Sequence, residues 1–265
     1  MRKFYLAIAA TVLMMVSSVM PSLANRLAYI DQTEHLIRIT DLAKSAGQEI
    51  QSIKIGREVD PGSLRWSPDG SRLVYSGGGN IYLINLKSDT PHPTRRWKGR
   101  YPCFLKSGKV AYVNGQDIFM EEKSKDNLDY GTITQLCSFY GENNKVACPV
   151  YGRTQHVEVG NLTNSGRFGI VFPHRRITQI DTTPDSGLLV FAYEEGKRRG
   201  VTIYDIPSGR SREILKSSSP VAWRSSVAFY YVSAKELWRY NHLKQTYARV
   251  ARLKSTTNSI AYTKT

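Results

Sequence analysis

The sequence predicts an all-β fold, a six-bladed β-propeller made of four-stranded antiparallel blades. Three observations support this prediction. Residues 64–86 contain three strand-like runs separated by two turn signals. Hairpins of the same kind recur along the chain at about the spacing of one blade. A lone strand-like run near the C-terminus, residues 258–263, is available to complete the first blade, which begins one strand short.

Residues 64–86 define the repeat. Their first turn, Ser-Pro-Asp-Gly-Ser at 67–71, breaks any helix, because proline has no amide hydrogen and the aspartate side chain bonds backbone amides two residues further on. Three glycines at 77–79 supply the positive φ angles of a tight hairpin. The flanking runs 72–75 and 81–86 carry the β-branched and aromatic residues that strands favour.

Degenerate copies of this unit follow along the chain. Residues 183–187 keep the proline and the aspartate of the turn, and elsewhere only the hairpin survives. The pattern predicts six blades. Equivalent hairpin positions are 46, 37, 36, 43 and 39 residues apart, near the roughly 40–45 residues of a four-stranded blade. These positions are Tyr29, Tyr75, Tyr112, Cys148, Phe191 and Tyr230.

The two ends of the propeller are expected to meet in one blade. Pairing of residues 258–263 with residues 27–30 would close the ring without an exposed strand edge. The alternative is a frayed C-terminal tail, since chain ends are often poorly ordered.

The Ser-Pro-Asp-Gly turn followed by an apolar hairpin resembles the WD-like repeat of the TolB-type propellers. The resemblance covers the propeller portion only, because TolB carries a separate α/β domain ahead of its blades. It implies a protein-interaction module that, in that family, docks a peptidoglycan-associated lipoprotein.

Residues 1–24 have the pattern of a secretory signal peptide. A basic start precedes an apolar run at 4–20, and small residues at 22 and 24 precede the expected cleavage after Ala24. An uncleaved anchor is the alternative, although the apolar run is shorter than the roughly 20 residues of a spanning helix. We therefore expect a periplasmic or secreted protein, with residues 25–265 forming one propeller domain and no transmembrane span after cleavage.

The three cysteines suit an oxidising compartment. If a hairpin turn occupies residues 141–144, Cys137 lies opposite Cys148, within reach of a disulfide. The alternative is two buried thiols, because a slip of one residue would separate the pair. Cys103 is expected in an inner strand as a small apolar residue.

The chain is strongly basic, with 37 lysines and arginines against 22 acidic residues and a net charge of +15. Removal of Arg2 and Lys3 with the signal would leave +13. Such a field attracts acidic proteins and anionic polymers. An exported protein meets little nucleic acid, so we expect an acidic protein or an anionic envelope component as the partner.

Basic clusters from distant parts of the chain are predicted to share one face. In an up-and-down blade, the loops between second and third strands lie on the same face as the connections between blades. The predicted partner-binding residues are Arg95, Arg96, Trp97, Arg100, Arg175, Arg176, Lys197, Arg198 and Arg199. Trp97 is a candidate aromatic anchor. The alternative is that these charges only keep loops and outer strands soluble.

Catalytic and metal-binding motifs are missing from the sequence. It contains no nucleophile elbow, phosphate-binding loop or zinc-binding His-Glu-x-x-His motif, and its five histidines are scattered. Asp69 and Asp185 occupy equivalent turns of different blades, too far apart for paired acid–base chemistry. No cofactor and no metal are expected.

The leading hypothesis is a monomeric, non-enzymatic interaction or scaffold module that binds an acidic or anionic envelope partner. The alternative is a propeller enzyme, a lyase or hydrolase acting on an anionic glycan at the axial end of the channel.

Overall fold

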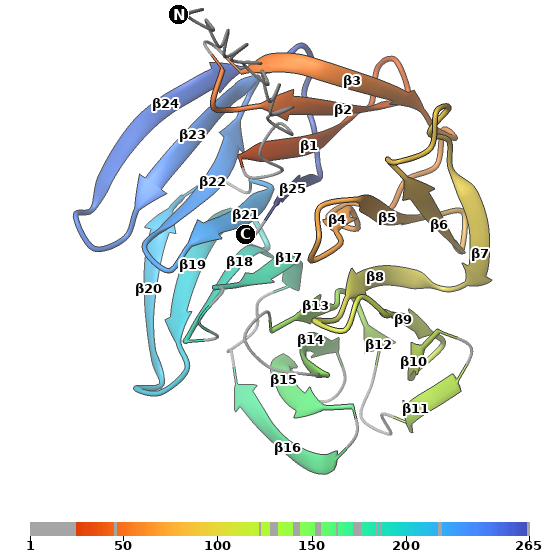
Figure 1. Ribbon diagram of the computed structural model, residues 1–265. Coiled ribbons are helices and arrows are strands. Elements are labelled where there is room, and N and C mark those ends of the chain that lie inside the picture. The colour runs from red at the N-terminus through yellow and green to blue at the C-terminus, as the bar shows by residue number, and fades with distance from the viewer. Residues whose placement is uncertain are drawn as a thin grey trace, which may run out of the picture.

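A computed structural model gives the architecture as a ring of six β-sheets (Figure 1). It describes residues 25–44, 47–121, 123–127, 132–139, 144–151, 155–162, 164–171, 176–183, 185, 187–216 and 219–263. Throughout these residues the secondary structure is β, with no helix. The predicted six-bladed propeller is confirmed. The expected signal peptide at residues 1–24 lies outside the described part of the chain.

Each blade is an antiparallel sheet whose strands run in order from the axis to the outside. From inner to outer strand, blade 1 contains β25 (Ile260–Tyr262), β1 (Arg26–Asp31), β2 (Leu36–Asp41) and β3 (Gln48–Lys54). Blade 2 contains β4 (Arg65–Trp66), β5 (Arg72–Gly77), β6 (Asn80–Asn85) and β7 (Thr94–Lys98). Blade 3 contains β8 (Arg100–Phe104), β9 (Val110–Asn114), β10 (Asp117–Met120) and β11 (Lys123–Asn127).

The second half of the ring follows the same plan. Blade 4 contains β12 (Thr132–Ile133), β13 (Cys137–Ser138), β14 (Lys145–Tyr151), β15 (Gln155–Asn161) and β16 (Asn164–Val171). Blade 5 contains β17 (Arg176–Thr182), β18 (Leu188–Glu195), β19 (Arg198–Asp205) and β20 (Arg210–Leu215). Blade 6 contains β21 (Val221–Ser225), β22 (Ala228–Ser233), β23 (Glu236–Asn241) and β24 (Thr246–Arg252). Blade 4 departs from the prediction because its inner strand is split into β12 and β13.

The Ser-Pro-Asp-Gly turn is held by its own side chains. Asp69 accepts hydrogen bonds of 2.6 Å from the hydroxyls of Ser67 and Ser71. These bonds, which stabilise the charged carboxylate, lower the pKa of Asp69 to about 2. In blade 5, Thr183 repeats the role of Ser67, since its hydroxyl accepts from the amide of Leu188 as that of Ser67 does from Arg72. The hydrogen bonds of Asp69 therefore show that the aspartate of the Ser-Pro-Asp-Gly repeat stabilises a turn.

The glycines of blade 2 have two separate roles. Gly78 and Gly79 have φ angles of 56° and 72°, which the tight turn between β5 and β6 requires. Gly77 allows a close approach, because a Cβ there would lie 1.8 Å from the carbonyl oxygen of Glu58. The connection from blade 1 consequently packs directly over the end of blade 2.

The core lies between neighbouring blades. Tyr75 packs between blades 1 and 2, Tyr112 between blades 2 and 3, and Phe191 between blades 4 and 5, each facing the preceding blade. Tyr230 faces the following blade instead. Phe229 and Tyr231 fill the equivalent space between blades 5 and 6, so the expected equivalence at Tyr230 is off by one residue.

The C-terminal strand closes the ring as predicted. In β25, Tyr262, Ala261 and Ile260 lie opposite Leu27, Ala28 and Tyr29 of β1 in an antiparallel ladder. The same strand also contacts blade 2. The indole nitrogen of Trp66 donates to the carbonyl of Ala261 at 3.2 Å, and the amide of Leu64 donates to the Ser259 hydroxyl at 3.2 Å.

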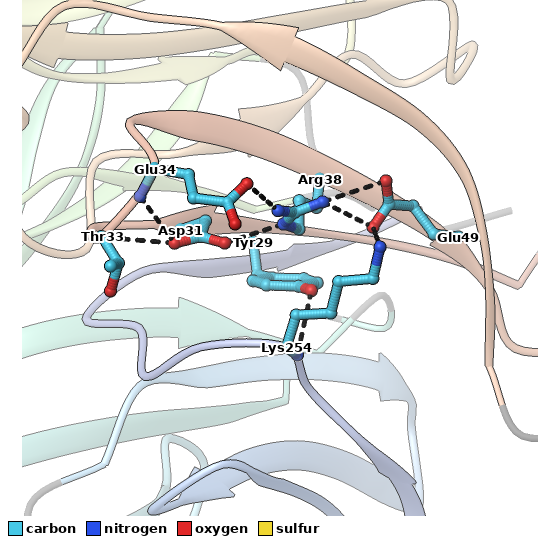
Figure 2. Close-up of polar contacts among 7 residues, drawn as sticks. All are labelled: Tyr29, Asp31, Thr33, Glu34, Arg38, Glu49 and Lys254. Atoms are coloured by element: carbon cyan, nitrogen blue, oxygen red, sulfur yellow. Dashed lines mark hydrogen bonds and ion pairs between the residues drawn. The ribbon is translucent and has the colours of Figure 1, made fainter.

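A buried arginine reinforces this closure on the blade 1 side (Figure 2). Arg38 is 4% exposed and contacts the carboxylates of Asp31 at 2.8 Å, Glu34 at 2.5 Å and Glu49 at 2.8 Å. Lys254, in the segment leading to β25, reaches Glu49 at 3.1 Å. The network therefore ties the closing segment to β2 and β3.

The expected disulfide between Cys137 and Cys148 requires correction. Cys137 lies opposite Ala147 and not opposite Cys148, one residue away from the predicted register. A slip of one residue turns a side chain to the other face of the sheet. Cys137 packs toward blade 5, whereas Cys148 packs with Cys103 toward blade 3, and all three are buried thiols.

We expect deletion of residues 258–265 to destabilise the protein by on the order of 5 kcal/mol. The deletion removes the burial of Ile260 and Tyr262 and the ladder to β1. Differential scanning calorimetry should show a melting temperature lower by roughly 10–20 °C. Removal of residues 264–265 alone is the control and should leave melting unchanged. Equal melting of both truncations would contradict closure by β25.

We expect Asp31→Asn to cost about 3 kcal/mol at neutral pH, because it leaves the buried Arg38 short of a partner. Burial raises the pKa of Asp31, but hydrogen bonds from Arg38 and the Glu34 amide outweigh it, so the pKa is lowered. This stabilisation is present above about pH 4 and is lost as the pH falls through the folded-state pKa. Urea unfolding of the variant should therefore show a weaker acid dependence. Exposed Asp89→Asn is the control.

Mass spectrometry after denaturation without reductant should find three alkylated thiols per chain. In the native protein, alkylation of Cys148 should be slow, because burial raises its pKa and excludes the reagent. A peptide pair crosslinked through Cys137 and Cys148 would contradict the observed register.

Candidate functional site

One face of the ring is hollowed at its centre. We call it the upper face; it carries turns between second and third strands, such as residues 78–79 and 196–197, and connections between blades, such as residues 55–64 and 253–259. A cavity of about 440 Å³ opens where the inner strands begin. We call it the axial cavity, and its lining includes Tyr101, Gln135, Arg176, Glu194, Arg199 and Asn258.

The split inner strand of blade 4 places Gln135 in this cavity. Between Ile133, which lies opposite Val150, and Cys137, which lies opposite Ala147, three residues of the inner strand face two of β14. One of those two is Pro149, which accepts a hydrogen bond from Thr134 but has no amide to return. The result is a local bulge, a common way to redirect a side chain toward a site.

Gln135 and Arg65 cross the channel beneath the cavity. The Gln135 side-chain nitrogen donates to the carbonyls of Pro61 at 2.9 Å and Thr178 at 3.0 Å, which joins blade 4 to the entry of blade 2 and to blade 5. Arg65 of blade 2 donates to the carbonyl of Ile180 in blade 5 at 3.1 Å. Below them the open space is about 30 Å³, roughly one water molecule. Gln135 lines the axial cavity, and Arg65 lines this smaller space.

Tyr101 is held in an unusual backbone conformation at the cavity wall. Its φ is 52°, and the pairing of β8 with β9 is irregular between Arg100 and Cys103. A hydrogen-bonded chain supports it: the Tyr101 amide donates to Ser76 at 3.1 Å, and the Ser76 hydroxyl donates to Asp60 at 2.7 Å. Positive φ is rare for a bulky residue and clusters at functional sites. Burial raises the pKa of Tyr101, so its hydroxyl stays protonated.

Three charges form a row across blade 5 at the cavity rim. Arg176 of β17 lies opposite Glu194 of β18, which in turn lies opposite Arg199 of β19. Cross-strand neighbours of this kind have Cβ atoms about 5 Å apart. The Arg199 Nε atom is 3.6 Å from the Glu194 carboxylate, longer than a hydrogen bond. The row has a net charge of +1 and presents two guanidinium groups to the cavity.

A second cavity of about 310 Å³ adjoins the first. It shares Tyr101 and Thr134 with the axial cavity and extends to Gly79 and Arg100 at the edge of blades 2 and 3. The upper face thus has two neighbouring cavities, one lined by Arg176 and Arg199 and the other by Arg100.

The predicted basic residues are only partly brought together. Arg176 and Arg199 line the axial cavity, and Arg100 lines its neighbour. Lys197 and Arg198 are exposed at the upper end of blade 5 but line neither cavity.

The blade 2 cluster is arranged differently. Arg95 and Arg96 lie on the outer strand β7, away from the axis. Trp97 is half-buried and stacks on Tyr112 with ring centroids 5.5 Å apart, which makes it part of the contact between blades 2 and 3. Arg175 lies outside the described residues.

The sequence pattern did not predict several residues of the axial cavity. Tyr101, Gln135 and Asn258 come from irregular segments at the starts of inner strands, which have no periodic pattern. Part of the row of Arg176, Glu194 and Arg199 could have been predicted from the sequence. Glu194 and Arg199 flank a short glycine turn in one hairpin, which makes them cross-strand neighbours.

Other candidate sites are not assembled in the described residues. Asp69 and Asp185 are in turns of blades 2 and 5, on opposite sides of the ring (Figure 1). Within the described ranges, no group of three metal-ligating side chains is placed to hold an ion. No helix long and apolar enough to span a membrane occurs in them either.

Comparison with known proteins relates this architecture to solved propellers. TolB from Acinetobacter baumannii superposes with a TM-score of 0.71 at 16% identity, covering 91% of this chain and 67% of that one. The fold is a TolB-like propeller. A protein from Agrobacterium tumefaciens that is named as a TolB gives a TM-score of 0.58 at 10% identity, covering 88% of this chain and 92% of that one.

The same propeller also resembles a chain of a second solved complex. A chain of the nidogen/laminin complex matches with a TM-score of 0.68 at 10% identity, covering 90% of this chain and 98% of that one. No protein-family profile and no curated protein matches the sequence. Identities this low establish the fold alone.

Proposed function

We propose that this TolB-like propeller is an exported, monomeric, non-enzymatic interaction module that binds an acidic protein partner of the cell envelope through its upper face. The observation that carries the proposal is the convergence of Arg176 and Arg199, from two strands of blade 5, on the axial cavity. Arg100 extends the basic surface along the neighbouring cavity.

Electrostatics favour an anionic partner. The net charge of +13 that remains after loss of Arg2 and Lys3 gives the mature protein a positive field that attracts acidic surfaces from a distance. Concave sites focus such fields. Arg65, whose described hydrogen bonds all run to backbone carbonyls, adds a further positive charge beneath the cavity.

Export supports an envelope partner over nucleic acid. Residues 1–24 have the basic start, apolar run and small residues of a signal peptide, and cleavage would leave residues 25–265 as one propeller domain. The TolB-like fold is consistent with a docking role outside the cytoplasm. We propose the periplasm as its location.

Reversal of Arg175, Arg176, Arg198 and Arg199 to glutamate should abolish salt-sensitive capture of the envelope partner. Arg176, Arg198 and Arg199 are exposed, and exposed substitutions usually cost little stability, so melting should shift by only a few degrees. The measurement is a pull-down from envelope extracts with the mature protein at low and high salt, because salt screens charge-driven contacts.

The control reverses four exposed charges at the opposite ends of the blades: Lys87, Lys109, Arg210 and Lys244. It changes the net charge by the same amount, so it should weaken capture only slightly. Equal loss in both variants would show that net charge, and not the upper face, drives binding. Unchanged capture by the first variant would exclude the upper face of blade 5.

A further inference from the structure

The axial cavity presents different chemistry at its rim and at its floor. The rim carries exposed charges, with 63% of the Arg199 side chain and 32% of the Glu194 side chain accessible. The floor carries neutral amides: Gln135 is 3% exposed, and Asn258 is half-buried. A ligand that entered this cavity would meet guanidinium groups and a carboxylate first and amides below.

Two amide oxygens at the floor lack hydrogen-bond partners. Gln135 Oε1 and Asn258 Oδ1 are buried and unbonded within the described part of the chain. The orientation of Gln135 follows from its nitrogen, which donates to two carbonyls and leaves the oxygen as the spare acceptor. A buried acceptor without a partner costs roughly 1–3 kcal/mol. A ligand that donates N–H groups would recover part of this cost.

The rim selects for a carboxylate. Arg176 and Arg199 flank Glu194. The 3.6 Å separation between Arg199 Nε and the Glu194 carboxylate is too long for a hydrogen bond, so the Arg199 Nε–H remains available to a ligand. Guanidinium groups bind carboxylates strongly and often through two parallel hydrogen bonds. Glu194 lies between them and provides a counter-charge for an ammonium group.

We propose that the axial cavity binds a small zwitterion, an amino acid or short peptide, whose carboxylate contacts Arg176 and Arg199 and whose N–H groups face Glu194, Gln135 and Asn258. The volume of about 440 Å³ lies within the usual range of small-molecule sites. A simple anion would leave the floor acceptors unsatisfied, and a simple cation would meet two arginines. This small-ligand site goes beyond the proposed macromolecular partner and does not depend on it.

The test uses glycylglycine as the probe in isothermal titration calorimetry with the mature protein. We expect saturable 1:1 binding. Glycylglycinamide, which lacks the carboxylate, should bind at least tenfold more weakly. Acetate, which lacks N–H donors, should also bind at least tenfold more weakly. Acetate binding as tight as glycylglycine, or no glycylglycine binding at millimolar concentration, would overturn the proposal.

A matched pair of variants locates the site. Arg199→Gln should weaken glycylglycine binding about tenfold or more, whereas Arg198→Gln, one residue away and outside the cavity lining, should change it less than twofold. Asn258→Ala should weaken binding severalfold with unchanged melting, because the deleted oxygen has no hydrogen-bond partner among the described residues. Equal losses in the Arg198 and Arg199 variants would place the ligand elsewhere.

The two proposals fail separately. If the envelope partner is captured but glycylglycine does not bind, the small-ligand site is wrong and the interaction face stands. If glycylglycine binds as expected but no salt-sensitive capture occurs, the interaction face is wrong and the small-ligand site stands.

Discussion

The axial cavity of the upper face depends on the pairing of β25 with β1. A propeller blade needs an inner strand, and blade 1 obtains its inner strand from residues more than two hundred positions away. The pairing places Ser259 and Ala261 against blade 2 and Asn258 at the axial cavity. The Arg38 network, through Lys254, anchors the segment just before β25. Loss of this one ladder would open the ring and disassemble the cavity together with it.

Once the ring is closed, polar bonds between inner strands shape its channel. Ser138 donates to Phe104 of blade 3, Thr182 donates to Ser138, and Gln179 bridges to Val221 of blade 6. These contacts satisfy polar groups that the inner strands bury at the axis, where an unpaired group would be costly. The side chains of Gln135 and Arg65 then bridge the blades across the channel, and Gln135 contributes an amide to the lining of the axial cavity. Ring closure and the shape of the axial cavity are linked, because the first residues of the inner strands contribute to both.

Local sequence patterns predicted the blades and their turns, but they predicted the residues of the axial cavity only in part. The glycine turn at 77–79, the turn around Asp69 and the closing strand were all predictable, since each rests on residues close in sequence or on a simple strand count. Arg176 and Arg199, which loop alternation placed on one face, both line the axial cavity. The Cys137–Cys148 register was wrong, and the bulge at Gln135 was not foreseen, because turn length and bulges shift pairing by single residues.

By itself, the sequence determined the number of blades and their strand order, because these depend on periodicity and turn chemistry within each repeat. The tertiary structure alone decided which side chains meet at the axis. Tyr101, Gln135, Arg176 and Asn258 come from four segments of the chain and converge only because six blades share one centre. Convergence of this kind is set by ring geometry and by single-residue register, neither of which leaves a periodic trace in the sequence.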